Sequence, residues 1–272
     1  MRKNYLHFIF RIDQTEIDLL QEKSYIEGFN NIFFQSYDNN KWIAHVYIKK
    51  GENIPVFLAD RPLTFLEIEN TRLWTKNWKE NLKPFELIDG VRVIPMQEPK
   101  KIHSSKKIGI VPGLSFGTGL HETTKICAEF IHEFLQKNDR VLDIGTGTGI
   151  LSVLAMQFGA GYALAVDNDE LALSKCKETA WINNVKIDIA YSDFLSGIDS
   201  NQTFDLVVSN MIADPLLSYY KNVVTLMKEK SLFIISGILK NQQHLFMRSD
   251  TPYRIIKTKE KDEWTGFALK KK

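Results

Sequence analysis

The sequence has few cysteines and no long apolar run. Only two of its 272 residues are cysteines, Cys127 and Cys176, and they do not form a CxxC pair. We therefore expect neither a disulfide framework nor a metal site, and a reducing compartment fits. No stretch of about 18 apolar residues is present to cross a bilayer, and the alternating start does not resemble a signal peptide. We expect a cytoplasmic protein that makes no use of a membrane.

The chain also lacks an excess of charge of either sign. Its 35 Lys and Arg nearly balance its 33 Asp and Glu, which leaves a net charge of +2 and no global indication of nucleic-acid binding. Residues 72–107 are an exception, with nine basic against four acidic residues. Such a bias is typical of a surface for RNA or an acidic partner, or more often of a solvated face. We expect no requirement for nucleic acid.

What the chain does have is 44% hydrophobic residues and enough length for one large and one small domain. Residues 5–11 favour a strand, Asp13 and Glu16 have the spacing of a capping box at a helix start, and residues 31–36 and 42–49 favour two more strands. This order predicts a small α+β, ferredoxin-like domain over residues 1–66.

A connector helix is expected at residues 67–84. Trp74 and Trp78 lie four apart on one helical face, and Pro84 ends the pattern. A hairpin across Asp89 and Gly90 is then expected to open a second domain, residues 85–272.

From about residue 108 the pattern alternates between strand and helix. Most strands are continuous apolar runs, which is typical of a parallel sheet covered on both faces. We expect strands at 140–144, 162–166, 187–191, 204–209 and 232–236, helices at 150–158, 170–183 and 215–227, and a terminal hairpin at 254–257 and 266–269. The expected fold class of this domain is α/β.

A glycine-rich loop, D-I-G-T-G-T-G at residues 143–149, joins the first of these strands to a helix. Its glycines permit a sharp turn and close approach of a ligand. A dinucleotide fingerprint would need a third glycine at position 150, where the chain has Ile150. The D-x-G-x-G-x-G spacing instead resembles motif I of class I methyltransferases that use S-adenosylmethionine (AdoMet). That resemblance implies a Rossmann-like domain with a mostly parallel seven-stranded sheet; a glycine-rich turn without a ligand is the alternative.

Polar residues follow the next three strands. Asp167 can accept both hydroxyls of a ribose, and Asp169 is better placed than Asp167 to cap the following helix. By resemblance to the methyltransferases, Asp193 accepts from the adenine amino group, unless it is a solvated loop residue. Asn210 is a polar group near the expected methyl position. Met211 stands where enzymes acting on adenine or glutamine nitrogen have proline, which argues against a flat acceptor.

The segment P-G-L-S-F-G-T-G-L-H-E-T-T at residues 112–124 is more specific than motif I. It resembles the P-G-L-A-F-G-T-G-T-H-P-T-T loop of the ribosomal protein L11 methyltransferase (PrmA) family. Further likenesses are the Trp-bearing segment at 74–84, N-M-I-A-D-P-L at 210–216, S-G-I at 236–238, and Glu263 with Trp264. Leu120 and Glu122 depart from the family loop, and the first domain is short for the family, so the substrate stays open.

The resemblance implies methyl transfer from AdoMet to lysine side-chain or N-terminal amines of a large-subunit ribosomal protein, L11. It implies that the cofactor is bound by Phe116, Gly117, Thr124, Gly145, Gly147, Asp167, Asp193 and Asn210. Asn210 is also expected to orient AdoMet or the amine. His121 is a candidate base, or it orders the loop by hydrogen bonding. Phe116 packs on the cofactor or amine, or in the core.

Two other functions stay open at this point. One is a related lysine methyltransferase with another protein substrate, and the other is a scaffold that binds AdoMet without catalysis. In each case we expect a monomer.

Overall fold

The structure is a computed structural model that describes residues 5–27, 29, 32–38, 41–49, 51–66, 83–111, 119–247 and 250–272. It divides into two compact units, one within Met1–Asn81 and one within Leu82–Lys272. Of the expected connector helix, only Lys83 and Pro84 fall within the described residues. No helix in these ranges is long and apolar enough to cross a membrane.

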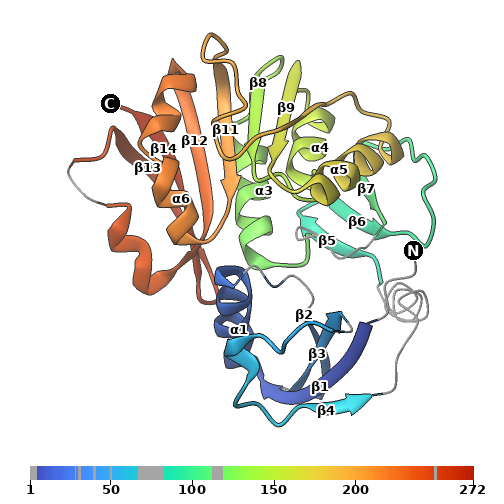
Figure 1. Ribbon diagram of the computed structural model, residues 1–272. Helices are drawn as coiled ribbons and strands as arrows, with labels where there is room; N and C mark the ends of the chain where they lie inside the picture. The colour runs from blue at the N-terminus through green and yellow to red at the C-terminus, as the bar shows by residue number, and fades with distance from the viewer. Residues whose placement is uncertain are drawn as a thin grey trace. The chain divides into compact units, whose positions relative to one another are not determined.

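The smaller unit is a four-stranded antiparallel sheet with one α-helix. Its elements are β1 (Tyr5–Asp13), α1 (Gln14–Ile26), β2 (Ile32–Asp38), β3 (Lys41–Lys49), the 3-10 helix η1 (Val56–Leu58) and β4 (Thr64–Leu66). The strand order β2-β3-β1-β4, drawn in blue and cyan in Figure 1, is that of the split β-α-β, ferredoxin-like arrangement. Between β3 and β4 the described residues form only η1 where that arrangement has a second helix.

The start of α1 has the expected capping contact. The backbone N–H of Asp13 donates to Glu16 Oε2 at 3.1 Å, as in a capping box. Alternate residues of β1 and β3, among them Phe10 and Val46, then pack with Leu20 of α1 in one core. The ferredoxin-like prediction is confirmed.

The larger unit is built on a seven-stranded sheet with the order β10-β9-β8-β11-β12-β14-β13. The strands are β8 (Arg140–Ile144), β9 (Tyr162–Asp167), β10 (Asp188–Tyr191), β11 (Phe204–Asn210), β12 (Met227–Leu239), β13 (Tyr253–Lys261) and β14 (Trp264–Lys271). The strands from β10 to β12 are parallel, whereas β14 and β13 pair antiparallel at one edge. The chain order reverses between β8 and β11, and in doubly wound sheets ligands bind beyond the carboxyl ends of the strands at such a point.

Helices cover both faces of this sheet (Figure 1). They are α3 (Glu122–Phe134), α4 (Ile150–Gln157), α5 (Glu170–Ile182) and α6 (Ala213–Tyr219), with the 3-10 helices η2 (Asn222–Leu226) and η3 (Lys240–Leu245). Neighbouring strand residues belong to different cores: Val141 packs with α3 and α4, and Leu142 packs with α6. Because both faces are buried, the strands are apolar at successive positions. The Rossmann-like prediction is confirmed.

A separate three-stranded sheet extends the core of α3 and α4. It contains β5 (Phe85–Ile88), β6 (Val91–Pro95) and β7 (Lys107–Ile110), with β5 and β6 forming the expected hairpin. The hairpin turn uses Gly90 at φ 75°.

The predicted helix at 215–227 is wrong in both bounds. Helix α6 already begins at Ala213, because proline is tolerated in the first turn, where its missing N–H has no helical acceptor to lose. The helix ends at Tyr219, η2 follows, and Met227 begins β12. Apolar spacing continues through all three elements and does not reveal these breaks. Strands β12, β13 and β14 are likewise longer than expected.

Candidate active site

The glycine-rich loop after β8 has a backbone that only glycine adopts readily. Gly145 and Gly149 have φ values of 71° and 79°. A Cβ on Gly145 would lie 2.9 Å from Met211 Sδ, and one on Gly149 would lie 2.5 Å from Cys176 Sγ. The spacing of these glycines is therefore required both by the turn and by the side chains packed against it.

Asp143, the first residue of this motif, lies wholly beneath the loop. Its Oδ2 accepts hydrogen bonds from Thr146 Oγ1 and Ser152 Oγ, both at 2.7 Å. Burial raises the pKa of Asp143 to about 6, although the hydrogen bonds from Ser152 and Thr146 lower it. The carboxyl group thus ties the start of the loop to α4. Sequence reasoning noted this aspartate only as part of a pattern and missed its two hydroxyl partners.

Asp167, at the carboxyl end of β9, contacts the same loop. Its Oδ2 accepts from the backbone N–H of Gly147 at 2.9 Å, and its Oδ1 accepts from that of Asp169 at 3.0 Å. Asp169 caps α5 by accepting from Leu171 N at 2.8 Å, as predicted. Asp167 is therefore not the helix cap, and each of its oxygens keeps acceptor capacity for a further donor.

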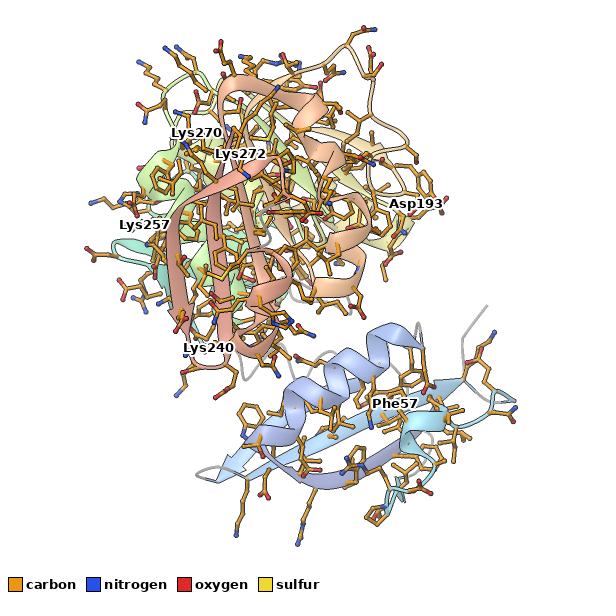
Figure 2. All side chains as sticks on the ribbon, turned by 90° about the vertical axis from the view of Figure 1, so that its left-hand side faces the viewer. Phe57, Asp193, Lys240, Lys257, Lys270 and Lys272 are labelled. Carbon is orange, nitrogen blue, oxygen red and sulfur yellow. The ribbon has the colours of Figure 1, made fainter. Side chains whose placement is uncertain are left out.

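Asp193 lies in the loop after β10, exposed at the surface of the larger unit (Figure 2). Its Oδ1 accepts from Asn168 Nδ2 at 3.3 Å. Asn168 directly follows Asp167, so this contact joins the loops after β9 and β10. Its neighbour Phe194 has a φ of 52°, which is unusual for a bulky residue.

Asn210 and Thr124 come together at the point where the strand order reverses. Asn210 is the last residue of β11, and its Nδ2 donates to Thr124 Oγ1 at 3.2 Å. Thr124 lies in the first turn of α3 and is buried. Two side chains that the family resemblance assigns to the cofactor are therefore in contact.

His121 is the N-cap of α3. Its Nδ1 accepts from the backbone N–H of Thr123 at 3.3 Å and lies 2.9 Å from Thr123 Oγ1. Its ring meets Trp264 edge-on, with the centroids 4.9 Å apart. Burial lowers the pKa of His121 to about 4, so the imidazole is neutral near pH 7. Its role as a base stays a prediction.

Phe116 and Gly117 lie outside the described residues. The other predicted residues gather at the carboxyl ends of β8 to β11: Gly145 and Gly147 after β8, Asp167 after β9, Asp193 after β10, and Asn210 after β11 with Thr124 and His121 from α3. Backbone turns, carboxylates and amides at this edge suit a ligand with a nucleoside part and a polar tail.

Comparison with known proteins agrees with the family resemblance found in the sequence. A family model described as "Ribosomal protein L11 methyltransferase (PrmA)" matches residues 10–272. The chain is 37% identical over 276 residues to a ribosomal protein L11 methyltransferase of Thermotoga neapolitana, covering 100% of both chains. It is 36% identical to that of Thermosipho africanus, covering 99% of this chain and 100% of the relative. A solved ribosomal protein L11 methylase from Lactobacillus delbrueckii subsp. bulgaricus is similar with a TM-score of 0.64 and 26% identity, over 70% of this chain and 100% of that one.

Proposed function

Because the chain belongs to the ribosomal protein L11 methyltransferase (PrmA) family, we propose that it transfers methyl groups from AdoMet to amines of ribosomal protein L11. The acceptors are lysine side-chain amines, the N-terminal amine, or both. The observation that carries the proposal is the match along nearly the whole chain. The contact between Asn210 and Thr124 beside the glycine-rich loop supports it from the side of the structure.

The residues at the sheet edge fit AdoMet. Asp167 accepts one backbone N–H on each oxygen, which leaves lone pairs on both for the two ribose hydroxyls. Asp193, exposed one loop away, is the acceptor for the adenine amino group. Gly145 and Gly147 let the backbone approach the cofactor closely. Asn210 and Thr124 contact its amino-acid end, and Phe116 and Gly117 complete the contacts.

The cofactor, when bound, supplies an electrophilic methyl group on a sulfonium, and the protein has to align a neutral amine with it. A lysine with a pKa of about 10.4 is mostly protonated at pH 7, and its deprotonation costs about 4.6 kcal/mol. A nearby positive charge and removal from water both lower that pKa. Asn210 orients the amine, and water carries the proton away, so no strong base is needed.

In this proposal His121 orders the start of α3 and does not act as the base. Its Nδ1 is occupied by the Thr123 N–H, so a neutral ring carries its proton on Nε2 and has no lone pair left for a substrate proton. Its cap on α3 and its contact with Trp264 instead order the start of the helix that carries Thr124.

We assign substrate recognition to residues 1–66, a linking role to 67–84 and catalysis to 85–272. We further propose a monomeric, cytoplasmic enzyme that needs no nucleic acid. Deletion of residues 1–66 is expected to abolish methylation of the ribosomal protein while AdoMet binding, which serves as the folding control, persists. Methylation at the full rate by the shortened chain would contradict this division of roles.

The proposed reaction is tested by mass spectrometry of purified ribosomal protein L11 after incubation with the enzyme and AdoMet. Addition of one or more methyl groups is the expected result. Methylation of another protein in a whole lysate, with L11 unmodified, would show a different substrate. AdoMet binding by calorimetry without transfer to any lysate protein would indicate a binding scaffold.

A further inference from the structure

We propose that Tyr219, the last residue of α6, is a positioning residue that holds three loops of the cofactor site in register. The inference rests on the proposed function, because those loops are the ones assigned to AdoMet. Tyr219 is only 4% exposed, touches the end of β11 and the loop after β10, and is linked to the end of β8 through Ser209. No pattern in the sequence marks it.

The first link runs through the hydroxyl group. Tyr219 Oη lies 2.6 Å from Ser209 Oγ, and Ser209 Oγ donates to the backbone oxygen of Ile144 at 3.0 Å. Ile144 directly precedes Gly145, and Ser209 directly precedes Asn210. Since Ser209 gives its proton to Ile144, the phenol is the donor toward Ser209 and shares its one proton between Ser209 Oγ and Met211 Sδ. This buried chain fixes the end of β8 against the end of β11.

The second link is Met211. Tyr219 Oη lies 3.2 Å from Met211 Sδ, the atom that closes the space beside Gly145. The Met211 backbone is held from the other side, because its N–H donates to Ser236 O at 3.1 Å. At Gly237, with φ 88°, a Cβ would lie 2.3 Å from Met211 O. Met211 is therefore confined between β12 and the glycine-rich loop, and the Tyr219 hydroxyl contacts its sulfur.

The third link is a ring contact with Phe194. The two rings stack with centroids 4.8 Å apart and planes 23° apart. Phe194 has the left-handed backbone noted above and is further held by Ser192 Oγ, which donates to its carbonyl at 2.8 Å. Because a left-handed backbone is unfavourable for a bulky residue, the stack with Tyr219 helps to keep it in place. Phe194 follows Asp193, so the stack places the loop assigned to adenine.

These links join the two ends of the cofactor site. The loop of Asp193 holds the adenine end, whereas Gly145 and Asn210 lie at the methyl-transfer end. A shift of one loop against the other would bind the cofactor less tightly and misalign the methyl group. The hydroxyl and the ring of Tyr219 act on different loops, so two substitutions separate their effects.

The next residue supplies a matched control. Tyr220 is equally buried, at 3% exposure, and its hydroxyl donates to Phe246 O at 3.4 Å and accepts from Thr251 Oγ1 at 3.2 Å. Its ring packs on Phe233 of β12, on Phe246, which directly follows η3, and on Tyr253 of β13. Tyr220→Phe removes a buried, hydrogen-bonded hydroxyl of the same kind without touching the three loops.

The test compares wild type, Tyr219→Phe, Tyr219→Leu and Tyr220→Phe in the full chain. The measurements are AdoMet affinity by calorimetry, kcat and KM for AdoMet, and melting temperature. We expect Tyr219→Phe to weaken AdoMet binding about three- to tenfold, the effect of one lost hydrogen bond. Tyr219→Leu also loses the stack and should weaken binding further. Tyr220→Phe should lower the melting temperature by a similar amount while AdoMet affinity stays within about twofold.

Equal AdoMet affinities for Tyr219→Phe and Tyr220→Phe would overturn the positioning role, with the proposed function intact. Failure of the wild type to bind AdoMet would overturn the proposed function instead. If Tyr219→Leu does not fold, the comparison between the two Phe variants decides, because each removes only one oxygen atom.

Discussion

Asn210 donates a hydrogen bond to Thr124 across 86 residues of sequence, and this bond joins the end of β11 to the first turn of α3. One partner comes from the sheet and the other from a helix that precedes it in the chain. A side-chain hydrogen bond, in addition to the backbone packing, therefore holds α3 against this edge of the sheet. Each partner can be altered without changing the volume of its side chain.

We predict that Thr124→Val lowers kcat/KM for AdoMet about five- to tenfold, because it leaves the Asn210 amide without its acceptor. Thr124→Ser keeps the hydroxyl and should stay within about threefold of wild type. Steady-state kinetics with varied AdoMet distinguish the two. A loss in Thr124→Ser with Thr124→Val near wild type would mean that the methyl group of Thr124, and not the hydrogen bond, is what matters.

We predict that Asp167→Asn weakens AdoMet binding about tenfold or more, since a hydrogen bond to a charged group contributes about 1.5–3 kcal/mol. Asp169→Asn is the control, because asparagine caps a helix as well as aspartate does. Calorimetry gives both affinities directly. Unchanged affinity in Asp167→Asn would remove the ribose assignment.

Asp143 should make the protein less stable as pH rises from about 4 to about 6. Its pKa is raised from 3.8 to about 6 by burial, so the folded chain keeps a proton that the unfolded chain has already lost. The resulting loss of stability is fully present above pH 6 and amounts to roughly 3 kcal/mol at about 1.36 kcal/mol per pKa unit. Asp143→Asn keeps an acceptor for Thr146 and Ser152 and should remove this contribution to the pH dependence of stability, measured by urea unfolding at several pH values. An identical pH slope in wild type and variant would contradict the prediction.

His121 should have the opposite effect. Burial lowers its pKa from 6.5 to about 4, so the unfolded chain binds the extra proton first. Its contribution to stability is present above about pH 6.5 and is lost as pH falls toward 4, by at most roughly 3 kcal/mol. His121→Asn retains a residue suited to the N-cap and should remove this contribution to the pH dependence of stability. The same urea series measures it, and an unchanged acid slope would count against a buried neutral histidine.

In the wild type, the contributions of Asp143 and His121 to the pH dependence of stability nearly cancel between about pH 4 and 6. Substitution of either residue should therefore reveal the contribution of the other. Asp143→Asn should become more acid-sensitive than wild type, and His121→Asn should become more stable in acid than at neutrality. The pKa shift of each group is set by burial and by other neighbours, so the double variant should show the sum of the two changes.

Much of the fold could be predicted because buried strand positions are occupied by apolar residues, and this pattern is visible in the sequence. Val141 and Leu142 face opposite cores, and such doubly buried strands have no polar alternation. Asp169 could be assigned as a cap because a cap has to stand directly before the first helical residue. The breaks around α6 could not be predicted, because apolar spacing runs through them and only tertiary packing ends the helix.

The site was predictable in its members and not in its contacts. The glycine spacing and the acidic residues after each strand point to one sheet edge, since parallel strands end together. The bond from Asn210 to Thr124 and the stack of Tyr219 on Phe194 depend on which strands are neighbours. Local patterns carry no information on pairs this distant, and Tyr219 therefore had no signal at all.

The position of β14 also decides the order in which the larger unit can assemble. β14 lies between β12 and β13, so β13 has no partner in the sheet until the later strand has paired with β12. A chain still lacking Trp264–Lys271 would present the edge of β12 to any other extended segment nearby. During synthesis, the seven-stranded sheet cannot be completed until Trp264–Lys271 has been made. We expect a nascent chain that stalls before this segment to be bound by chaperones.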